Sequence, residues 1–465
     1  MSDINKVIEG GYCIGCGACT LGQSDSTYQV GLDPLGFYRA QETRPDKGTV
    51  KLDSICPFTN GGPHEDQIAS SLFAGLEWQQ AKYLGSYLSL YAGHVAQNGF
   101  RVRGSSGGFT SWILAELLTR GLVDAVIHVK PSSEGEVLYE YGISKNVDEL
   151  NAGAKSHYYP VEMSGVLEFI RNTPGRYAVV GVPCFIKALR RLSECEAVFN
   201  ERIHYCVGLF CGHLKSKGFA ESLAAQCGVT PKQLSAIDFR TKLEGRPSYS
   251  YGITAFGVDH GKEFNKTRSV SDLVGTDWGM GFFKYKACDF CDDLSAETAD
   301  VSVGDAWLPQ YSNDSMGTNV VIVRRPEIRS LIEEGIESGA LSFEPLSLED
   351  VIKSQSANVR HRREDLPYRL KKADDEGQWR PLKREDAGDI CDKKRQSIQD
   401  QRMHFRDNVP QVWAEAVERD DCSYFFKKIK PWVRSYNKLY GRHCSFPRKV
   451  YRKLRAYLKD HWKSS

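Results

Sequence analysis

The chain has 465 residues, a length that is too great for one small core and predicts two or three domains. Its composition, 26% charged and 41% hydrophobic, is that of an ordinary water-soluble protein. Residues 1–11 carry neither the basic region nor the apolar region of a signal peptide. No apolar run approaches the roughly 18 residues that are needed to span a bilayer. We therefore expect a cytoplasmic protein.

The formal net charge of +2 conceals an uneven distribution. Residues 422–465 contain 13 Lys and Arg and one acidic residue, Asp460, so the rest of the chain is net acidic. A basic end on an acidic chain indicates a segment with its own role.

The predicted elements begin after a loop-rich module, residues 1–75, that is rich in Gly, Cys and turn formers. Residues 84–95 read as the first strand of a larger body. A Gly-rich loop follows, then a helix over residues 109–119 with apolar side chains at helical spacing, and then a buried strand over 123–129.

Further along, residues 175–192 again predict a strand, a tight turn and a helix, and residues 203–213 and 317–325 predict strands. Strands that alternate with helices favour an α/β or mixed α+β fold. Residues 355–410 are polar and charged, which predicts a surface linker with partial helix.

Fourteen cysteines in a reducing compartment indicate metal ligation or redox chemistry rather than disulfides. The first set has Cys-x2-Cys-x2-Cys spacing, completed by a Cys-Pro pair, which is the ligand pattern of ferredoxins. Glycines in the loop would let the thiolates converge. A zinc knuckle or free thiols are the alternatives, but zinc sites usually use two separated Cys-x2-Cys pairs. The set comprises Cys13, Cys16, Cys19 and Cys56.

A second set is predicted around the pair Cys288 and Cys291. Its best further candidates are Cys184 and Cys211, because each flanks a glycine at a strand end, where α/β sheets place their sites. Each of these two alone is more often a buried structural cysteine. Cys206 remains a substitute for Cys211. The other cysteines lie in no motif and are interpreted as structural.

The loop Gly104–Ser105–Ser106–Gly107–Gly108 precedes a helix and matches neither the Walker pattern nor G-x-G-x-x-G. Its amides and hydroxyls at the positive end of a helix dipole would form a site for a phosphate or pyrophosphate. The alternative is a serine N-cap in a tight turn.

The motifs "CIGCGAC", "ICPF", "GSSGGF", "AGAKSHYYP", "GVPCFIKALR", "GLFCGH", "FRTK" and "CDFCDDLSAETADVSVGD" occur in this order between about Gly11 and Arg325. Together they resemble the beta subunits of hydrogenases and dehydrogenases that use the deazaflavin coenzyme F420. That family includes iron–sulfur flavoproteins similar to 7-hydroxymethyl chlorophyll a reductase. The basic C-terminal segment has no counterpart in this pattern.

The resemblance implies an FAD-dependent oxidoreductase with two 4Fe–4S clusters, held by the two cysteine sets. It implies that the Ser-Gly-Gly loop holds the flavin phosphates, and it adds Thr110, Lys155 and Ser156 as flavin contacts. It places Arg240 and Lys242 near the cofactor or substrate. His213 is a weak candidate for a proton donor, and a structural histidine is the more common case.

The expected architecture has four parts: a ferredoxin-like 4Fe–4S module (1–75), an N-terminal body domain with the flavin phosphate loop (76–170), a C-terminal body domain with the second cluster (171–350), and a polar linker with a basic amphipathic helical tail (351–465).

The main functional hypothesis is a reductase that passes single electrons from a ferredoxin-type donor through two clusters to FAD. FAD would then reduce a small organic or lipid-linked substrate, and surface-polysaccharide metabolism is attractive by analogy only. One alternative is an oxidoreductase of F420 itself. Others are an electron-transfer adaptor without a substrate, and a zinc-stabilised nucleic-acid binder, which is the least favoured.

Residues 422–465 interleave aromatic residues with Lys and Arg, and their apolar residues from Phe446 to Trp462 predict one stripe of a helix. Such a segment suits an anionic membrane surface at the inner face of the membrane. It equally suits a helix that packs its apolar stripe on its own domain and leaves its charges solvated. An acidic protein partner or nucleic acid is a third option.

Overall fold

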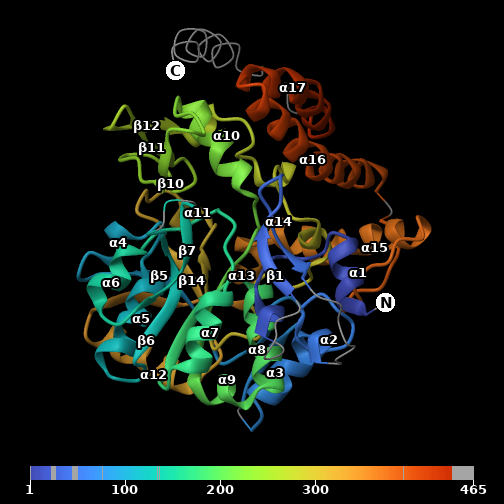
Figure 1. Ribbon diagram of the computed structural model, residues 1–465. Coiled ribbons are helices and arrows are strands. Elements are labelled where there is room, and N and C mark those ends of the chain that lie inside the picture. The colour runs from blue at the N-terminus through green and yellow to red at the C-terminus, as the bar shows by residue number, and fades with distance from the viewer. Residues whose placement is uncertain are drawn as a thin grey trace.

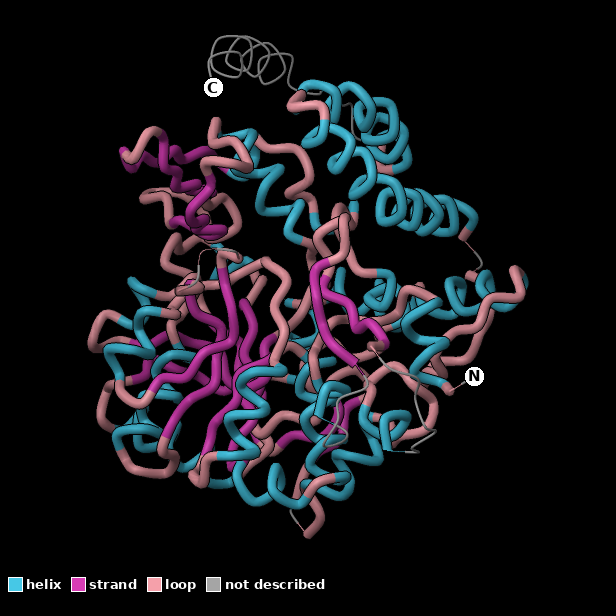
Figure 2. The backbone as a smooth tube through the Cα atoms, in the orientation of Figure 1, coloured by secondary structure: helices cyan, strands magenta, loops and turns pink. Residues whose placement is uncertain are grey.

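The computed structural model describes residues 2–21, 28–43, 51–75, 77–133, 135, 137–390 and 392–441. Figure 1 shows a lower body of sheet and helices, with a smaller part above it that carries a three-stranded sheet and two long helices. The fold is mixed α/β, as expected from the alternation of strands and helices (Figure 2). Among the described helices, none is both long enough and apolar enough to cross a membrane.

An eight-stranded sheet forms the centre of the body, in the order β15-β5-β14-β13-β9-β8-β6-β7. The neighbours β13, β9, β8 and β6 are parallel, whereas the other pairs are antiparallel. The strands are β5 (Ser89–Val95), β6 (Ala125–Pro131), β7 (Tyr139–Ser144), β8 (Tyr177–Gly181), β9 (Ile203–Leu209), β13 (Val301–Asp305), β14 (Asn319–Val323) and β15 (Leu341–Pro345).

Both faces of this sheet are buried, because alternate residues of the central strands enter different cores. In β8, Ala178 and Val180 pack in one core and Tyr177 and Val179 in another. The first core contains side chains from α5 (Phe109–Thr119), α6 (Val147–Ala152) and α12 (Pro326–Glu337). The second contains side chains from α7 (Ser164–Asn172), α8 (Pro183–Cys195) and α9 (Ala197–Arg202).

The N-terminal module lies against the second of these cores (Figure 1). It consists of α1 (Asp3–Glu9), a 3₁₀ turn (Ala18–Leu21), the hairpin of β1 (Tyr28–Leu32) and β2 (Tyr38–Glu42), α2 (Lys51–Ile55) and α3 (Glu65–Leu72). Short strands β3 (Gln79–Ala81) and β4 (Gly85–Tyr87) lead into the body, and α4 (Phe100–Arg103) follows β5.

The upper part contains the antiparallel strands β10 (Leu234–Thr241), β11 (Gly252–Asp259) and β12 (Lys262–Ser269), which are packed against α10 (Lys217–Cys227). The chain returns to the body through 3₁₀ turns at Val270–Asp272, Trp278–Met280 and Lys286–Phe290, and α11 (Pro309–Ser312) follows β13. After β15 come α13 (Leu348–Ser354), α14 (Ser356–Val359), a π-helical turn (Arg360–Glu364), α15 (Leu366–Asp375), α16 (Lys393–Glu418) and α17 (Cys422–Leu439).

The predicted elements around the Gly-rich loop are confirmed. The predicted helix over 109–119 is α5, and the predicted strand over 84–95 contains β4 and β5. The predicted strand–turn–helix over 175–192 is β8 followed by α8. Strands from both predicted body domains, 76–170 and 171–350, form one continuous sheet, and the module of residues 1–75 shares a hydrophobic core with that body.

The partial helix predicted over residues 355–410 is confirmed, but the prediction that this segment is a surface linker is wrong. Leu366, Leu370 and Phe405 are fully buried, and the Arg362 and Arg369 side chains are each only 1% exposed. Composition misled the prediction because buried arginines that bond to backbone carbonyls look the same in a sequence as solvated ones.

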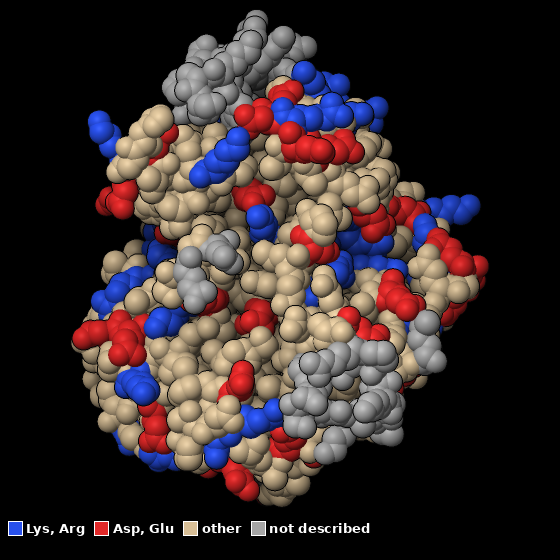
Figure 3. All heavy atoms as spheres, in the orientation of Figure 1, with Lys and Arg blue, Asp and Glu red and all other residues tan. Residues whose placement is uncertain are grey.

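The described part of the basic tail packs on its own domain. Phe425, Ile429 and Val433 of α17 enter the core of the upper part, while Lys427 and Arg434 face solvent. Figure 3 shows Lys and Arg side chains gathered at this end of the molecule, beside acidic ones. The predicted stripe from Phe446 to Trp462 lies outside the described residues.

We expect the replacement Ile429→Ala to lower the midpoint of urea unfolding, followed by tryptophan fluorescence. The deletion of a fully buried branched side chain typically costs about 2–5 kcal/mol, and Ile429 has no exposed surface. The matched variant Lys427→Ala, on the solvent face of the same helix, should leave the midpoint unchanged. Equal midpoints for the two variants would show that α17 does not dock through this face.

Candidate redox site

The candidate site lies at one edge of the central sheet. The parallel strands β8, β9 and β13 all end at this edge, and β5 runs in the same direction because β14, between β5 and β13, is antiparallel to both. Cys184 follows β8 and Cys211 follows β9. The Gly-rich loop follows α4, and the Val95 N–H at the end of β5 donates to the Gly107 carbonyl of this loop at 2.9 Å. Two strand widths, about 10 Å, separate the start of β14 from the end of β9. The sheet topology thus brings the predicted phosphate loop and the predicted second cysteine set to neighbouring positions.

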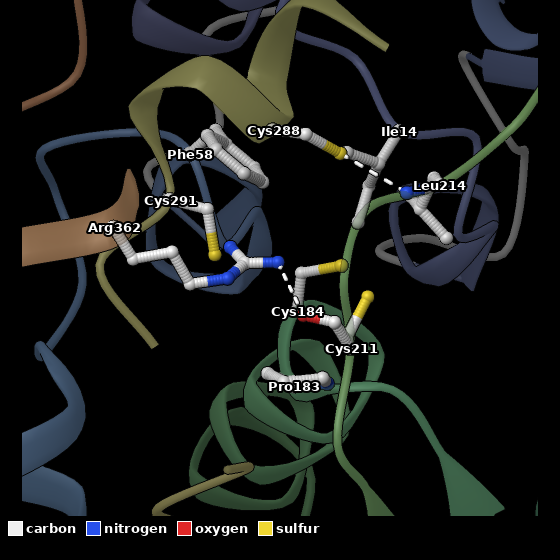
Figure 4. Close-up of a pocket in the computed structure, with 9 residues that line it drawn as sticks. All are labelled: Ile14, Phe58, Pro183, Cys184, Cys211, Leu214, Cys288, Cys291 and Arg362. Atoms are coloured by element: carbon white, nitrogen blue, oxygen red, sulfur yellow. Dashed lines mark hydrogen bonds between the residues drawn. The ribbon is translucent and has the colours of Figure 1, made fainter. Parts of the chain in front are cut away.

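The second cysteine set lines one cavity (Figure 4). All four of its sulfur atoms face the same space, although they come from three separate points in the sequence. The remaining wall is formed by Ile14, Phe58, Pro183, Leu214 and Arg362. The substitute Cys206 does not line this cavity: it is fully buried within β9 and enters the core below the sheet.

Burial raises the pKa values of these thiols. The pKa of Cys211 is raised to about 11 and that of Cys288 to about 12, first by burial and then by neighbouring cysteines of the set. The pKa of Cys184 is raised well above its usual value by burial and by the other three cysteines. The four thiols therefore affect one another electrostatically, and they can lose their protons together only if positive charge enters the cavity.

The first cysteine set also converges. Burial raises the pKa of Cys19 well above its usual value, and Cys16, Cys13 and Cys56 raise it further because they lie close to it. Burial likewise raises the pKa of Cys56 to about 11.

Backbone N–H groups point at one sulfur of this first set. Gly15 and Ala40 donate to Cys13 Sγ at 3.4 and 3.2 Å. Gly15 has φ +65°, and a side chain there would meet Tyr38 at 2.4 Å, so the loop requires glycine. Amides that face a sulfur are donors suited to a thiolate.

The two cysteine sets are neighbours. Ile14 and Phe58, which come from the loops that carry the first set, line the cavity of the second. Cys16 also raises the pKa of Cys184 across this wall. Among the described residues, no three or more His, Cys, Asp or Glu side chains are grouped as the ligands of a single metal ion would be.

The Gly-rich loop lies beside several of the predicted cofactor residues. Ser105 Oγ accepts a hydrogen bond from the Ser156 N–H at 2.9 Å, and Lys242 Nζ donates to the Ser106 carbonyl at 3.3 Å. Gly107 packs closely against Asn319 at the start of β14, which leaves no space for a side chain. Thr110 is half-buried in the first turn of α5.

Four cations surround this loop: Arg101, Lys155, Arg240 and Lys242. Burial, followed by the three neighbouring cations, lowers the pKa of Lys242 to about 8. Each of these three neighbours has a carboxylate partner: Arg101 pairs with Asp314 at 2.7 Å, Lys155 with Asp238 at 3.0 Å and Arg240 with Asp305 at 2.6 Å. The charge of Lys242 adds to these pairs, and a net positive charge beside the loop suits an anionic ligand.

Arg240 lies between the loop and the cysteine cavity. Asp305, the carboxylate partner of Arg240, is the last residue of β13. The Arg240 guanidinium lies over the rings of Tyr251 and Trp307, 5.1 and 5.5 Å from their centroids. Sequence reasoning missed Arg101 and these three partners of Arg240. The only available signal was the strand-end position of Asp305.

His213, the weak proton-donor candidate, is 8% exposed, and its ring lies 4.7 Å from that of Trp278. Burial and then Lys215 lower its pKa well below the usual value, so the imidazole is neutral. Its Nε2 atom has no hydrogen-bond partner in the part of the chain that the structure describes.

Two family models match the chain. The model for the N-terminal part of the coenzyme F420 hydrogenase/dehydrogenase beta subunit covers residues 90–168, and that for its C terminus covers residues 175–349. Together they span more than half of the chain. The chain therefore belongs to this family, as the resemblance predicted. The first cysteine set and Arg362 lie outside the matched residues.

Curated relatives agree with this assignment. The coenzyme F420-dependent sulfite reductase of Methanocaldococcus jannaschii is 21% identical over 387 residues, which are 79% of this chain and 52% of that protein. The coenzyme F420 hydrogenase subunit beta of Methanococcus voltae is 21% identical and is matched over 57% of this chain and 87% of its own. The chain thus spans about half the length of the sulfite reductase.

Among solved structures, the F420-reducing [NiFe] hydrogenase complex of Methanosarcina barkeri matches with a TM-score of 0.47 and 15% identity, over 63% of this chain and 96% of that chain. The names of the relatives are those of oxidoreductases and their subunits, which supports a redox role. They favour the F420 alternative over the organic-substrate hypothesis and give no support to a link with polysaccharide metabolism.

The reduced pKa of Lys242 predicts a pH dependence of anion binding at the loop. A phosphate group beside Lys242 would raise its pKa again, so binding above pH 8 must take up a proton. We expect the affinity for FAD to fall by up to about tenfold per pH unit above pH 8, as measured by fluorescence titration. The variant Lys242→Gln should bind more weakly at pH 7 and lose this dependence. An unchanged pH profile in the variant would exclude Lys242 as the titrating group.

Proposed function

We propose that the protein is an iron–sulfur flavoprotein that exchanges electrons with the deazaflavin coenzyme F420. The main support for the proposal is the arrangement at the carboxyl ends of the parallel strands. There the Ser-Gly-Gly loop, with its surrounding cations, lies near the second set of four cysteines, and the first set of four is adjacent to the second. Flavin exchanges electrons singly or in pairs whereas a 4Fe–4S cluster exchanges one at a time, so the two groups together join one-electron and two-electron chemistry.

The second cysteine set fits a cluster in its donor chemistry. A 4Fe–4S cluster takes one thiolate at each iron and is stabilised by hydrogen bonds to its sulfur atoms. Four thiols around one cavity supply the ligands, and two buried guanidinium nitrogens of Arg362 have no protein partner within the described residues. Cys184, Cys211, Cys288 and Cys291 would hold this cluster, and Cys13, Cys16, Cys19 and Cys56 the other.

The loop fits the phosphates of a flavin nucleotide. The donors would be the amides and hydroxyls of Ser105 and Ser106, at the start of α5, and the ammonium of Lys242. Arg240 Nε is buried and has no hydrogen-bond partner in the described chain, so it retains a donor for a ligand. FAD is thus the implied group at this site, and Thr110, Lys155 and Ser156 stay predicted contacts.

The chain's own residues bind and orient the groups. Asp305 and the rings of Tyr251 and Trp307 fix the Arg240 guanidinium, so its position is set before a ligand arrives. Ile14 and Phe58 separate the two cysteine sets and exclude water between them. His213 is neutral and its lowered pKa disfavours the protonated imidazolium, so we assign it no step.

F420 is preferred to a small organic or lipid-linked substrate because two relatives carry F420 in their names. One of these relatives is named as a subunit, which favours a protein partner as the source or acceptor of single electrons. A ferredoxin-like protein remains the proposed partner class. An anionic membrane surface is not favoured for residues 422–439, since their apolar face is buried.

The test is an anaerobic assay of the protein reconstituted with iron, sulfide and FAD. Two equivalents of reduced methyl viologen, with protons from water, should reduce each F420, and the loss of the coenzyme's visible absorbance measures the rate. Full cofactor content without any F420 turnover in either direction would overturn the substrate assignment. Activity only after a partner protein is added would support the adaptor alternative.

Cysteine substitution on one helix tests the second cluster. Cys184 and Cys195 lie at opposite ends of α8, and only Cys184 lines the cavity. We expect about eight irons per chain in the native protein and about four in Cys184→Ser, since each cluster holds four irons. Cys195→Ser should retain the full iron content. Iron that is unchanged in Cys184→Ser would remove this residue from the ligand set.

A further inference from the structure

Arg362 is a buried arginine with two unused donors. Its side chain is 1% exposed. Its Nη2 atom donates to the carbonyls of Cys211 and Gly212 at 2.7 and 2.8 Å. Its Nε and Nη1 atoms have no hydrogen-bond partner among the described residues. Native proteins rarely leave buried donors unpaired, so these two indicate a bound group.

The Arg362 guanidinium extends into the space that the four sulfur atoms of the second set surround (Figure 4). Arg362 enters this space from the π-helical turn Arg360–Glu364, between α14 and α15. Such turns often occur at functional sites, because the extra residue changes the direction of a side chain. The neighbouring Arg363 pairs instead with Glu297 and Glu385, so only Arg362 of this turn lines the cavity.

The first cysteine set has a different arginine arrangement. Arg191 is also buried, but its Nε donates to the Pro63 carbonyl at 2.9 Å and its Nη2 to the Gly62 carbonyl at 2.7 Å. Its Nη1 donates to the Cys56 carbonyl. Every nitrogen of Arg191 therefore bonds to the protein, whereas Arg362 retains two N–H groups for the group in its cavity.

We propose that Arg362 is a positioning residue that donates hydrogen bonds from Nε and Nη1 to sulfur atoms of the cluster held by the second cysteine set, the central cluster. These bonds raise the reduction potential of the central cluster above that of the cluster held by the first cysteine set, the front cluster. The inference rests on the proposed function, because it requires a cluster in the cavity. Reduction adds an electron to a buried anion, and a cation with N–H groups directed at sulfur stabilises the reduced state more than the oxidised one. With its potential raised in this way, the central cluster would be the preferred acceptor of single electrons.

The experiment is a redox titration of the reconstituted chain, followed by electron paramagnetic resonance. In Arg362→Met, the equilibrium constant for reduction of the central cluster should fall at least tenfold, a shift of about 59 mV for one electron. The front cluster should not change. Arg362→Lys keeps the charge and should recover part of the shift. Arg360→Met, which alters the half-exposed arginine of the same turn, is the matched control and should titrate as the native protein does.

The outcomes separate the two proposals. Two clusters require about eight irons. About four irons in the native chain, all retained in Cys184→Ser, would refute the central cluster and with it the proposed function. A full iron content with an unchanged central potential in Arg362→Met would overturn only the role of Arg362. If Arg362→Met loses iron, the role of Arg362 is tested in the native protein labelled with ¹⁵N-arginine. Electron–nuclear double resonance of that protein should detect a coupling between an arginine nitrogen and the central cluster. The absence of that coupling would overturn the inference.

Discussion

Two adjacent sets of buried thiols can become thiolates only where buried positive charge and backbone N–H groups balance them, and much of the fold serves this requirement. Burial alone raises the pKa values of most of these cysteines, and each cysteine raises those of its neighbours. The compensating groups come from different parts of the chain. Gly15 and Ala40 donate amides to the first set, Leu214 donates its N–H to Cys288, and Arg362 brings a full charge to the second set.

The segment that carries Cys288 and Cys291 depends on further arginines. Asp289 is completely buried, and although burial alone would raise its pKa, Lys284, Arg406 and Arg369 hold that pKa below its usual value. Glu297 pairs with Arg363 and Arg384 at 2.9 and 2.6 Å. The loss of one partner from such a buried pair leaves an uncompensated charge, which is strongly destabilising. Buried ion pairs therefore hold the segment that carries Cys288 and Cys291 in place. Apolar side chains at the same positions would alter the electrostatics of the cavity.

Local patterns in the sequence predicted the parts of the site that short-range rules determine. Helix α5 was predicted from its apolar spacing, and the convergence of Cys184 with Cys211 was predicted because both follow parallel strands. Arg362 could not be predicted, since nothing local distinguishes it from Arg360 and Arg363 in the same turn. Its role depends on a π-helical turn and on a carbonyl about 150 residues away, at Cys211. The position of Arg240 likewise depends on Asp305, which only the sheet order brings near.

The ion pairs around Asp289 also impose an order on biogenesis. Arg369 donates to the Asp289 carbonyl, and Arg406 pairs with its carboxylate at 2.7 Å. During synthesis, all cysteines of both sets emerge from the ribosome more than a hundred residues before Arg406 does. The loop with Cys288 and Cys291 can reach its final form only when α16 has been made and has packed against it. The proposed cluster in the second cavity would therefore be inserted late, after the sheet has formed, and a nascent chain that stops before α16 would carry exposed thiols open to oxidation.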